Sequence, residues 1–223
     1  MTWIHEALAF LKQLTHPESL NAMAGDMGIW LYVILIAIVF CETGLVVMPF
    51  LPGDSLLFAI GAMAAIPGSP IHLPLLAGLL ILAAILGDAL NYTIGARLGP
   101  AAFHKERRWL NRKHLEAAHA FYEKHGGKTI ILARFVPIVR TFAPFVAGVA
   151  QMSYRQFALY NIVGAFLWVG LLVTAGRLFG GLPWVKTNFE IVVLAIVFIS
   201  VLPAVIEFLR ARSQARKATS AGE

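Results

Sequence analysis

Four ionisable residues lie within otherwise apolar sequence, two acids in the first half of the chain and two bases in the second. The acids are Glu42 and Asp54, and the bases are Arg134 and Arg140. A charge in a bilayer core costs about 2.5–3.5 kcal/mol on insertion scales, so it is retained where it faces a partner, water or a substrate. Arginine is always charged and can hold a phosphate through two parallel hydrogen bonds. This pattern predicts a polar membrane pocket in which the two arginines bind an anionic ligand, with phosphate favoured, and the acids gate it and exchange protons.

Helix-breaking residues surround each of these charged pairs. They are Pro49, Pro52 and Gly53 in the first stretch, and Pro137 and Pro144 in the second. Proline removes a helix hydrogen bond, and irregular backbone is tolerated in a membrane where protein or a water-filled cavity surrounds it. We therefore expect re-entrant hairpins at about 48–67 and 129–149 that carry the charges inward. The sequence also leaves open a purely structural set of ion pairs that holds the hairpins together.

Three further polar residues interrupt apolar segments and form a secondary set of candidates. They are Asp88, Asn91 and Thr141. Asn91 shares one helical stripe with Gly87 and Gly95, which favours close helix packing with the amide as a polar contact. Asn161, Gly164 and Trp168 look like the matching stripe in the other half. Asp88 requires a partner or water, because an isolated carboxylate is costly in an apolar setting.

The composition is that of an integral membrane protein. Hydrophobic residues make up 59% of the 223 residues and charged residues only 13%, against about 25% charged in soluble domains. The single Cys41 excludes an intrachain disulfide framework and a cysteine-based zinc site. Because the phosphate-loop, metalloprotease and serine-hydrolase motifs are all missing from the sequence, we expect neither enzymatic activity nor a metal or other cofactor.

The expected fold is an all-α integral membrane protein with three regions. An N-terminal amphipathic segment, 1–27, precedes a single polytopic domain, 28–209, and a basic cytoplasmic tail, 210–223. The domain should contain about four full spans, at 28–47, 73–98, 157–179 and 189–209, since a span needs about 20 residues. A polar stretch at about 103–126 is typical of an amphipathic surface helix. Each half pairs a re-entrant hairpin with a span, which predicts an inverted repeat of the kind found in secondary transporters.

Basic residues gather at 105–113 and 210–217, and they predict the orientation of the chain. Positive residues flanking membrane spans stay in the cytoplasm, so we expect both termini there. The two hairpins would then enter from opposite faces of the membrane. The same rule accounts for the net charge of +6 without nucleic acid as a partner.

Several of these motifs together resemble the DedA family of membrane proteins, which is related to the VTT-domain lipid scramblases. They include Glu42…Pro49-x-x-Pro52-Gly53-Asp54, Gly87-Asp88-x-x-x-Tyr92, and Arg134-Phe-Val-Pro137-x-x-Arg140-Thr141-x-x-Pro144. The resemblance covers about residues 28–180, and the family's two acids and two arginines match the four charged residues above. It implies a flippase that moves a phosphate-bearing lipid across the bacterial inner membrane, linked to the proton-motive force. The favoured lipid is undecaprenyl phosphate, with a phospholipid as the alternative, and protons are expected to bind in addition to the lipid. The sequence does not decide whether the protein forms a homodimer.

Two other functions are compatible with the sequence. A proton-coupled transporter of a small ion or amine would use Glu42 and Asp54 and make the arginines structural. A non-transporting membrane scaffold would bind partners through the 103–126 helix and would not need the buried acids. Replacement of Arg140 by lysine distinguishes the first alternative, because a phosphate site loses its two-pronged contact while a simple ion pair is partly retained.

Overall fold

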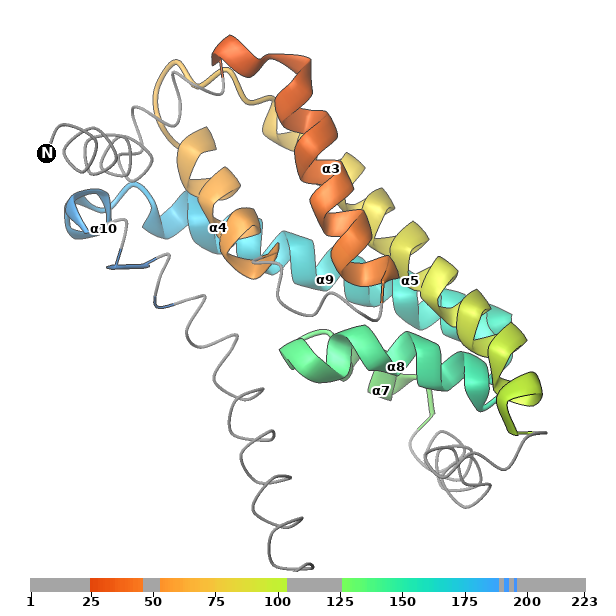
Figure 1. The fold of residues 1–223 in the computed structure, drawn as a ribbon. Helices are drawn as coiled ribbons and strands as arrows, with labels where there is room; N and C mark the ends of the chain where they lie inside the picture. The colour runs from red at the N-terminus through yellow and green to blue at the C-terminus, as the bar shows by residue number, and fades with distance from the viewer. Residues whose placement is uncertain (1–24, 46–52, 104–125, 189–190, 193–194, 196–223) are drawn as a thin grey trace, which may run out of the picture.

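The computed structural model describes residues 25–45, 53–103, 126–188, 191–192 and 195, and every regular element in these ranges is a helix (Figure 1). The helices are α3 (Ile29–Gly44), α4 (Gly53–Ala64), α5 (Leu73–Phe103), α7 (Lys128–Ala133), α8 (Pro137–Val149), α9 (Tyr154–Phe179) and α10 (Pro183–Thr187). The all-α class is therefore confirmed for this part of the chain. The expected surface helix and basic tail fall outside the described residues, as do nearly all of the N-terminal segment and of the last span.

Two helices in the described ranges are long and apolar enough to cross a membrane. They are Leu73–Leu98, within α5, and Tyr154–Phe179, which is α9. Both coincide with spans that the hydrophobic runs predict. The number of spans in the whole chain and the orientation of the termini stay predictions.

Helix α3 differs from the full span expected at 28–47. It has 16 residues and is about 24 Å long, whereas a membrane core is about 30 Å thick. Near its start, the Tyr32 hydroxyl accepts a hydrogen bond of 2.9 Å from the backbone N–H of His72, just before α5. Its last residue, Gly44, packs against Gly87, in the middle of α5. Helix α3 therefore accompanies α5 for only about half of that helix (Figure 1).

Helix α4 begins beside the end of α3, because Gly53 lies against the Glu42 carboxylate. The first part of the hairpin expected at 48–67, including Pro49 and Pro52, lies outside the described residues. In the second half, α7 ends at Ala133 and α8 begins at Pro137. Proline suits this first position, since the N–H that it lacks would have had no partner within the helix.

Pro144 does not break the chain as expected, because α8 continues through it to Val149. Proline removes one helix hydrogen bond, which destabilises a helix but does not end it where tertiary packing holds both sides. Residues on either side of Pro144 supply such packing. Ala143 and Ala147 are buried, and Gly148 contacts the backbone of α5.

Helices α4 and α9 cross at a pair of glycines. A Cβ atom at Gly61 would overlap the carbonyl oxygen of Val173, and one at Gly176 would overlap the carbonyl oxygen of Phe58. Gly61 lies three residues after Phe58, and Gly176 lies three residues after Val173, so the two contacts are symmetric. The two backbones approach more closely than any side chain at these positions would allow.

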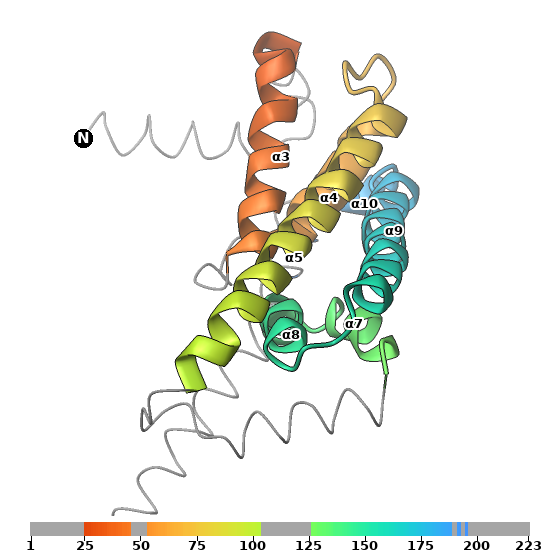
Figure 2. The ribbon, with the colours of Figure 1, turned by 90° about the vertical axis from the view of Figure 1, so that its right-hand side faces the viewer.

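Helices α5 and α8 cross in the same way. Cβ atoms at Gly95 and Gly148 would overlap the carbonyl oxygens of Phe145 and Tyr92, respectively. Gly95 lies three residues after Tyr92, and Gly148 lies three residues after Phe145, so the spacing of the first crossing is repeated. Figure 2 shows α8 against α5 at one end of the molecule, with α3 and α4 toward the other end. In these two crossings, the short helix α4 of the first half meets the long helix α9 of the second, and the short helix α8 of the second half meets the long helix α5 of the first.

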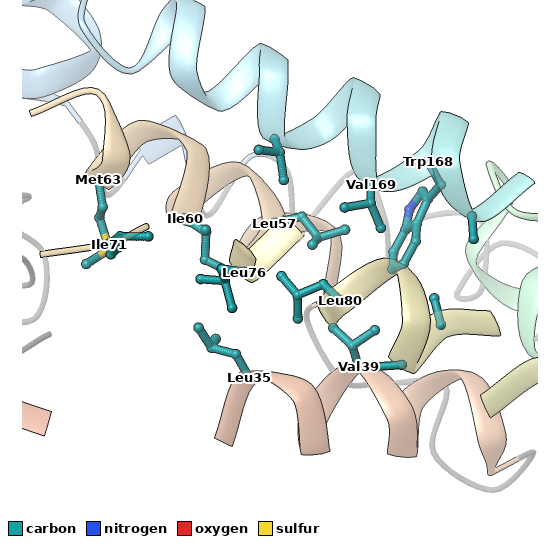
Figure 3. Packing of buried hydrophobic residues seen from close by; sticks show 14 residues of the cluster. Leu35, Val39, Leu57, Ile60, Met63, Ile71, Leu76, Leu80, Trp168 and Val169 are labelled. Carbon is teal, nitrogen blue, oxygen red and sulfur yellow. The ribbon is translucent and has the colours of Figure 1, made fainter. Parts of the chain in front are cut away.

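Apolar residues occur both inside and outside the bundle. Helices α3, α4, α5 and α9 share a core around Val39, Leu57, Leu80 and Val169 (Figure 3). Large apolar side chains are also exposed along the long helices, for example Leu82, Leu86, Phe166 and Leu171. Four charged side chains, by contrast, are buried within the described ranges: Glu42, Asp88, Arg134 and Arg140. An apolar exterior around buried charges is the arrangement expected of a protein surrounded by lipid.

Candidate functional site

Arg140 joins three separate helices through its guanidinium group. Its Nη1 donates a hydrogen bond of 2.6 Å to Asp54 Oδ1 at the start of α4, and its Nη2 donates to Glu42 Oε1 near the end of α3. The Arg140 side chain is 4% exposed and that of Glu42 is fully buried. The burial is tolerated because each ionised group has an opposite charge within hydrogen-bonding distance. Both acids singled out in the sequence therefore meet the same arginine.

Trp168 of α9 completes this arrangement. Its indole Nε1 donates a hydrogen bond of 2.8 Å to Asp54 Oδ1, and its ring lies 4.8 Å from the Arg140 guanidinium carbon. A cation over an indole face is a favourable contact, more so away from water. We call Glu42, Asp54, Arg140 and Trp168 the Arg140 cluster. The sequence stripe places Trp168 at a helix contact, but its two polar interactions were not predicted.

Replacing Trp168 with phenylalanine should destabilise the protein by about 1.5 kcal/mol. The aromatic ring remains beside Arg140, but Asp54 loses the indole N–H. Thermal unfolding in detergent, followed by circular dichroism, measures the change. Trp184→Phe is the matched control, because Trp184 is exposed and its replacement should change stability by less than about 0.5 kcal/mol. Equal effects of the two substitutions would contradict a structural role for the indole N–H.

Gly53 has a packing role in addition to starting α4. Any side chain at this position would overlap the carboxylate of Glu42. The first residue of α4 consequently lies directly against a buried acid.

Arg134 occupies a second site, in the connection between α7 and α8. Its Nη2 donates to Asp88 Oδ2 of α5 and to Asn161 Oδ1 of α9. Asn161 also donates a hydrogen bond of 3.1 Å to the carbonyl of Ile85. The arginine passes Gly164, where a Cβ atom would lie 2.8 Å from Arg134 Cδ. We call Asp88, Arg134, Asn161 and Gly164 the Arg134 cluster.

The four charges predicted from the sequence are therefore divided between two clusters. Glu42 and Asp54 both pair with Arg140, whereas Arg134 pairs with Asp88. The sequence identifies Asp88 as an acid that needs a partner but does not say which arginine supplies it. Asn161 is recognised only as part of a packing stripe, since an amide in an apolar helix is more often a helix contact.

Asn91 and Thr141 connect helices close to both clusters. The Asn91 Nδ2 donates to the carbonyl of Thr43 at 3.2 Å and to that of Thr141 at 2.8 Å. One amide thus ties α5 to α3 and to α8. Asn91 therefore makes a polar contact between packed helices, as the sequence predicts. Thr141 takes part in this contact through its backbone carbonyl.

Six buried side-chain atoms of these clusters and of Asn91 have no hydrogen-bond partner among the described residues. They are Glu42 Oε2, Asp88 Oδ1, Asn91 Oδ1, Arg134 Nε, Arg134 Nη1 and Arg140 Nε. Buried polar atoms without partners are rare in native proteins and often mark a functional site. Across the two clusters, the three carboxylates of Glu42, Asp54 and Asp88 pair with the two guanidinium groups of Arg134 and Arg140, and we call these five groups the charged layer. If all five groups are ionised, the layer carries one excess negative charge, so uptake of one proton would neutralise it.

Comparison with known proteins relates the chain to a group of membrane proteins. Residues 51–178 match the VTT domain. The chain is similar to "Protein DedA" of Escherichia coli (strain K12), with 52% identity over 200 residues that cover 89% of this chain and 91% of that protein. It is also similar to "Uncharacterized membrane protein Rv0364" of Mycobacterium tuberculosis (strain ATCC 25618 / H37Rv), with 46% identity over 185 residues, 82% of this chain and 81% of that one.

A third relative is more distant but spans a similar share. "Inner membrane protein YqjA" of Escherichia coli (strain K12) is 34% identical over 184 residues, which cover 80% of this chain and 81% of that protein. No solved structure matches the chain. The VTT domain match, residues 51–178, includes every member of the two clusters except Glu42. Glu42 lies before this match, in α3.

Proposed function

The chain belongs to the DedA family of VTT-domain membrane proteins, and on this basis we propose that it moves a phosphate-bearing lipid across the bacterial inner membrane. Undecaprenyl phosphate is the favoured substrate, with a phospholipid second, and the proton-motive force supplies the coupling. No covalent bond of the lipid changes, so the protein acts as a transporter and not as an enzyme. A relative with inner membrane in its name supports the location.

The observation that carries this proposal is the pair of buried arginines, each held by carboxylates inside an apolar exterior. A phosphate presents the same kind of charged oxygen acceptor as a carboxylate, and guanidinium binds either one through parallel hydrogen bonds. A lipid phosphate can therefore exchange with the acids without leaving either arginine uncompensated. The carboxylates hold the site in its empty state, and the headgroup replaces them during transport.

The ends of the short helices supply further stabilisation for an anion. Helix α4 begins at Gly53 beside Glu42, and α8 begins at Pro137, one turn before Arg140. Helix N-termini carry partial positive charge, and interrupted helices of secondary transporters direct these ends toward anionic groups. We propose that the re-entrant hairpins at about 48–67 and 129–149, which contain α4 and α7–α8, enter from opposite membrane faces. The matching glycine crossings of α4 with α9 and α8 with α5 support an inverted repeat. The basic residues at 105–113 and 210–217 favour an orientation with both termini in the cytoplasm.

Proton coupling follows from the excess of acids over bases in this layer. When a phosphate enters, the negative charge at the arginines rises and a displaced carboxylate loses its counter-ion. Protonation of that carboxylate removes the uncompensated charge, which would be costly in an apolar environment. A proton taken up on the outer face and released in the cytoplasm thereby drives the lipid in one direction.

Reconstitution into liposomes tests this function. Wild-type protein should move a fluorescent polyprenyl phosphate or a phospholipid between leaflets, and faster with a proton gradient. The Glu42→Gln/Asp54→Asn variant should lose at least about tenfold in gradient-driven rate, since one acid–base contact is worth about 1.5–3 kcal/mol. Asp26→Asn is the matched control, because Asp26 is exposed and lies outside both clusters.

The outcome also separates the competing functions. If the reconstituted protein moves no phosphate-bearing lipid with or without a gradient, the proposal is wrong. Proton-coupled uptake of a small ion or amine under the same conditions would favour the second transporter hypothesis. Full activity in cells of the Glu42→Gln/Asp54→Asn variant would favour a scaffold.

A further inference from the structure

We infer that the Arg134 cluster is the entry site for the anionic headgroup, and that Asp88 is the carboxylate that the headgroup displaces. In this assignment Arg140 closes the pathway and does not bind the phosphate first. The inference rests on the proposed function, since it assigns separate roles to the two arginines of that function. It also gives Asp88, Asn161 and Gly164 roles in substrate binding.

The hydrogen bonds of Arg134 distinguish it from Arg140. Among the described residues, only Nη2 of Arg134 has acceptors, while Nε and Nη1 have none. These two nitrogens carry three of the five N–H groups of a guanidinium. The side chain is nevertheless only 2% exposed. A buried cation with most of its donors unused is suited to an incoming ligand that offers several oxygen acceptors.

Arg140, in contrast, is held on three sides. Both of its terminal nitrogens donate to carboxylates, the Trp168 ring covers its face, and only Nε lacks a partner in the described ranges. A phosphate could bind both terminal nitrogens of this arginine only after displacing two acids from two helices. At Arg134, binding through both terminal nitrogens requires the displacement of one carboxylate, Asp88. The first binding step is therefore less costly at Arg134.

The surroundings of Arg134 favour a lipid phosphate over a free phosphate ion. Arg134 is buried, but Leu132, Phe135 and Val136 on either side of it are exposed. Leu132 lies near the end of α7, and Phe135 and Val136 lie in the connection between α7 and α8. A headgroup held by Arg134 would thus leave its hydrocarbon chain next to apolar side chains on the outside of the bundle. Asp88 and Asn161 hold the guanidinium in position from the inside.

Gly164 offers a way to disturb Arg134 without removing its charge. A Cβ atom at Gly164 would lie 2.8 Å from Cδ and 3.0 Å from Nε of Arg134. The contact is with a flexible side chain, so the arginine would shift while the helices keep their places. Gly170 lies on the same helix, and nothing approaches a Cβ atom there within 4 Å. Gly164→Ala and Gly170→Ala are therefore a matched pair.

Binding of two probes to purified full-length protein tests the inference. The probes are a short-chain polyprenyl phosphate and inorganic phosphate, each measured by native mass spectrometry. We expect Gly164→Ala to weaken lipid phosphate binding by about tenfold while Gly170→Ala leaves it unchanged. Asp88→Asn should strengthen binding severalfold, because the competing carboxylate is neutralised. Inorganic phosphate should bind more weakly than the lipid phosphate in every variant.

Two charge-balanced double variants compare the arginines with less risk of unfolding. Asp88→Asn/Arg134→Gln should lose lipid phosphate binding by at least about tenfold. Glu42→Gln/Arg140→Gln should keep binding within about threefold but lose transport, as expected if Arg140 closes the pathway and does not bind first. Thermal unfolding verifies that both variants are folded.

The reverse result, with binding lost only in the Arg140 variant, would overturn the inference and leave the proposed function intact. Equal binding of Gly164→Ala and Gly170→Ala would also overturn it. Inorganic phosphate that binds as tightly as the lipid phosphate would contradict the lipid assignment. If the wild type binds neither probe, the proposed function itself fails.

Discussion

Replacing Arg140 with alanine is expected to abolish lipid transport and to destabilise the protein by about 3–5 kcal/mol. The substitution leaves Glu42 and Asp54 without the cation that both of them contact. Removal of one member of a buried ion pair is costly because the remaining charge has neither water nor a counter-ion. Thermal unfolding in detergent measures the stability, and a liposome assay with a fluorescent lipid phosphate measures transport.

A triple variant separates the loss of stability from the loss of function. Glu42→Gln/Asp54→Asn/Arg140→Met removes all three charges at once, so it should recover most of the stability lost in Arg140→Ala. Transport should remain absent, because no cation closes the pathway. A triple variant that transports at the wild-type rate would show that the Arg140 cluster is only structural.

Arg140→Lys provides the intermediate case. Lysine keeps the positive charge, but an ammonium group is a compact point charge and cannot reproduce the planar geometry of guanidinium. It can therefore approach Glu42 or Asp54, but not both in the observed arrangement, in which Nη1 and Nη2 serve different acids. Transport should fall by about tenfold while stability falls by about 1–2 kcal/mol. Unchanged transport would indicate that the site requires a charge and no particular geometry.

The sequence predicts that Glu42 and Asp54 meet an arginine, because a buried charge requires a partner, but it leaves open whether that arginine is Arg134 or Arg140. The hydrophobic runs likewise predict α5 and α9, since a long apolar segment has few alternatives to a helix in lipid. Both predictions follow from properties that can be read in the sequence itself, namely the charge of a residue in an apolar segment and the length of an apolar run. The functional roles of these residues stay predictions.

The pairing of Arg134 with Asp88 could not be predicted in the same way. The sequence places two arginines six residues apart and suggests one shared pocket, but the break between α7 and α8 sends them to different helices. The direction of a side chain at such a break depends on the neighbours that pack around it. Gly164 is one of them, and its lack of a side chain decides where Arg134 can pass.

The short length of α3 and the continuity of α8 also depend on tertiary contacts. The apolar run at 28–47 is long enough for a span, yet the helix ends where Gly44 meets Gly87 and where Asn91 bonds to Thr43. Pro144 would be a break in an isolated helix, but packing of α8 on α5 outweighs its cost. Local propensity is a weak guide where long-range packing supplies most of the stability.

Alanine at either glycine of the α4–α9 crossing should destabilise the protein by about 3 kcal/mol. A Cβ atom at Gly176 would overlap the carbonyl of Phe58, and one at Gly61 that of Val173. The obstructing atoms belong to helix backbone, so the helices must separate and lose the apolar contacts around the crossing. Because Asp54 lies on α4 and Trp168 on α9, the same separation should lengthen the bond between them and reduce transport.

Alanine at Gly170 provides the control on α9, since nothing lies within 4 Å of a Cβ atom there. That substitution should be neutral or stabilise the protein by up to about 1 kcal/mol, because alanine favours the helix more than glycine does. Gly95→Ala and Gly78→Ala form the equivalent pair on α5, because a Cβ atom at Gly95 would meet the backbone of α8 while nothing lies within 4 Å of one at Gly78. If the two crossings are equivalent parts of a repeat, Gly95→Ala should lower the free energy of unfolding by about as much as Gly176→Ala does. A Gly176→Ala variant as stable as Gly170→Ala would contradict the close approach of α4 and α9, and with it the geometry that holds the Arg140 cluster together.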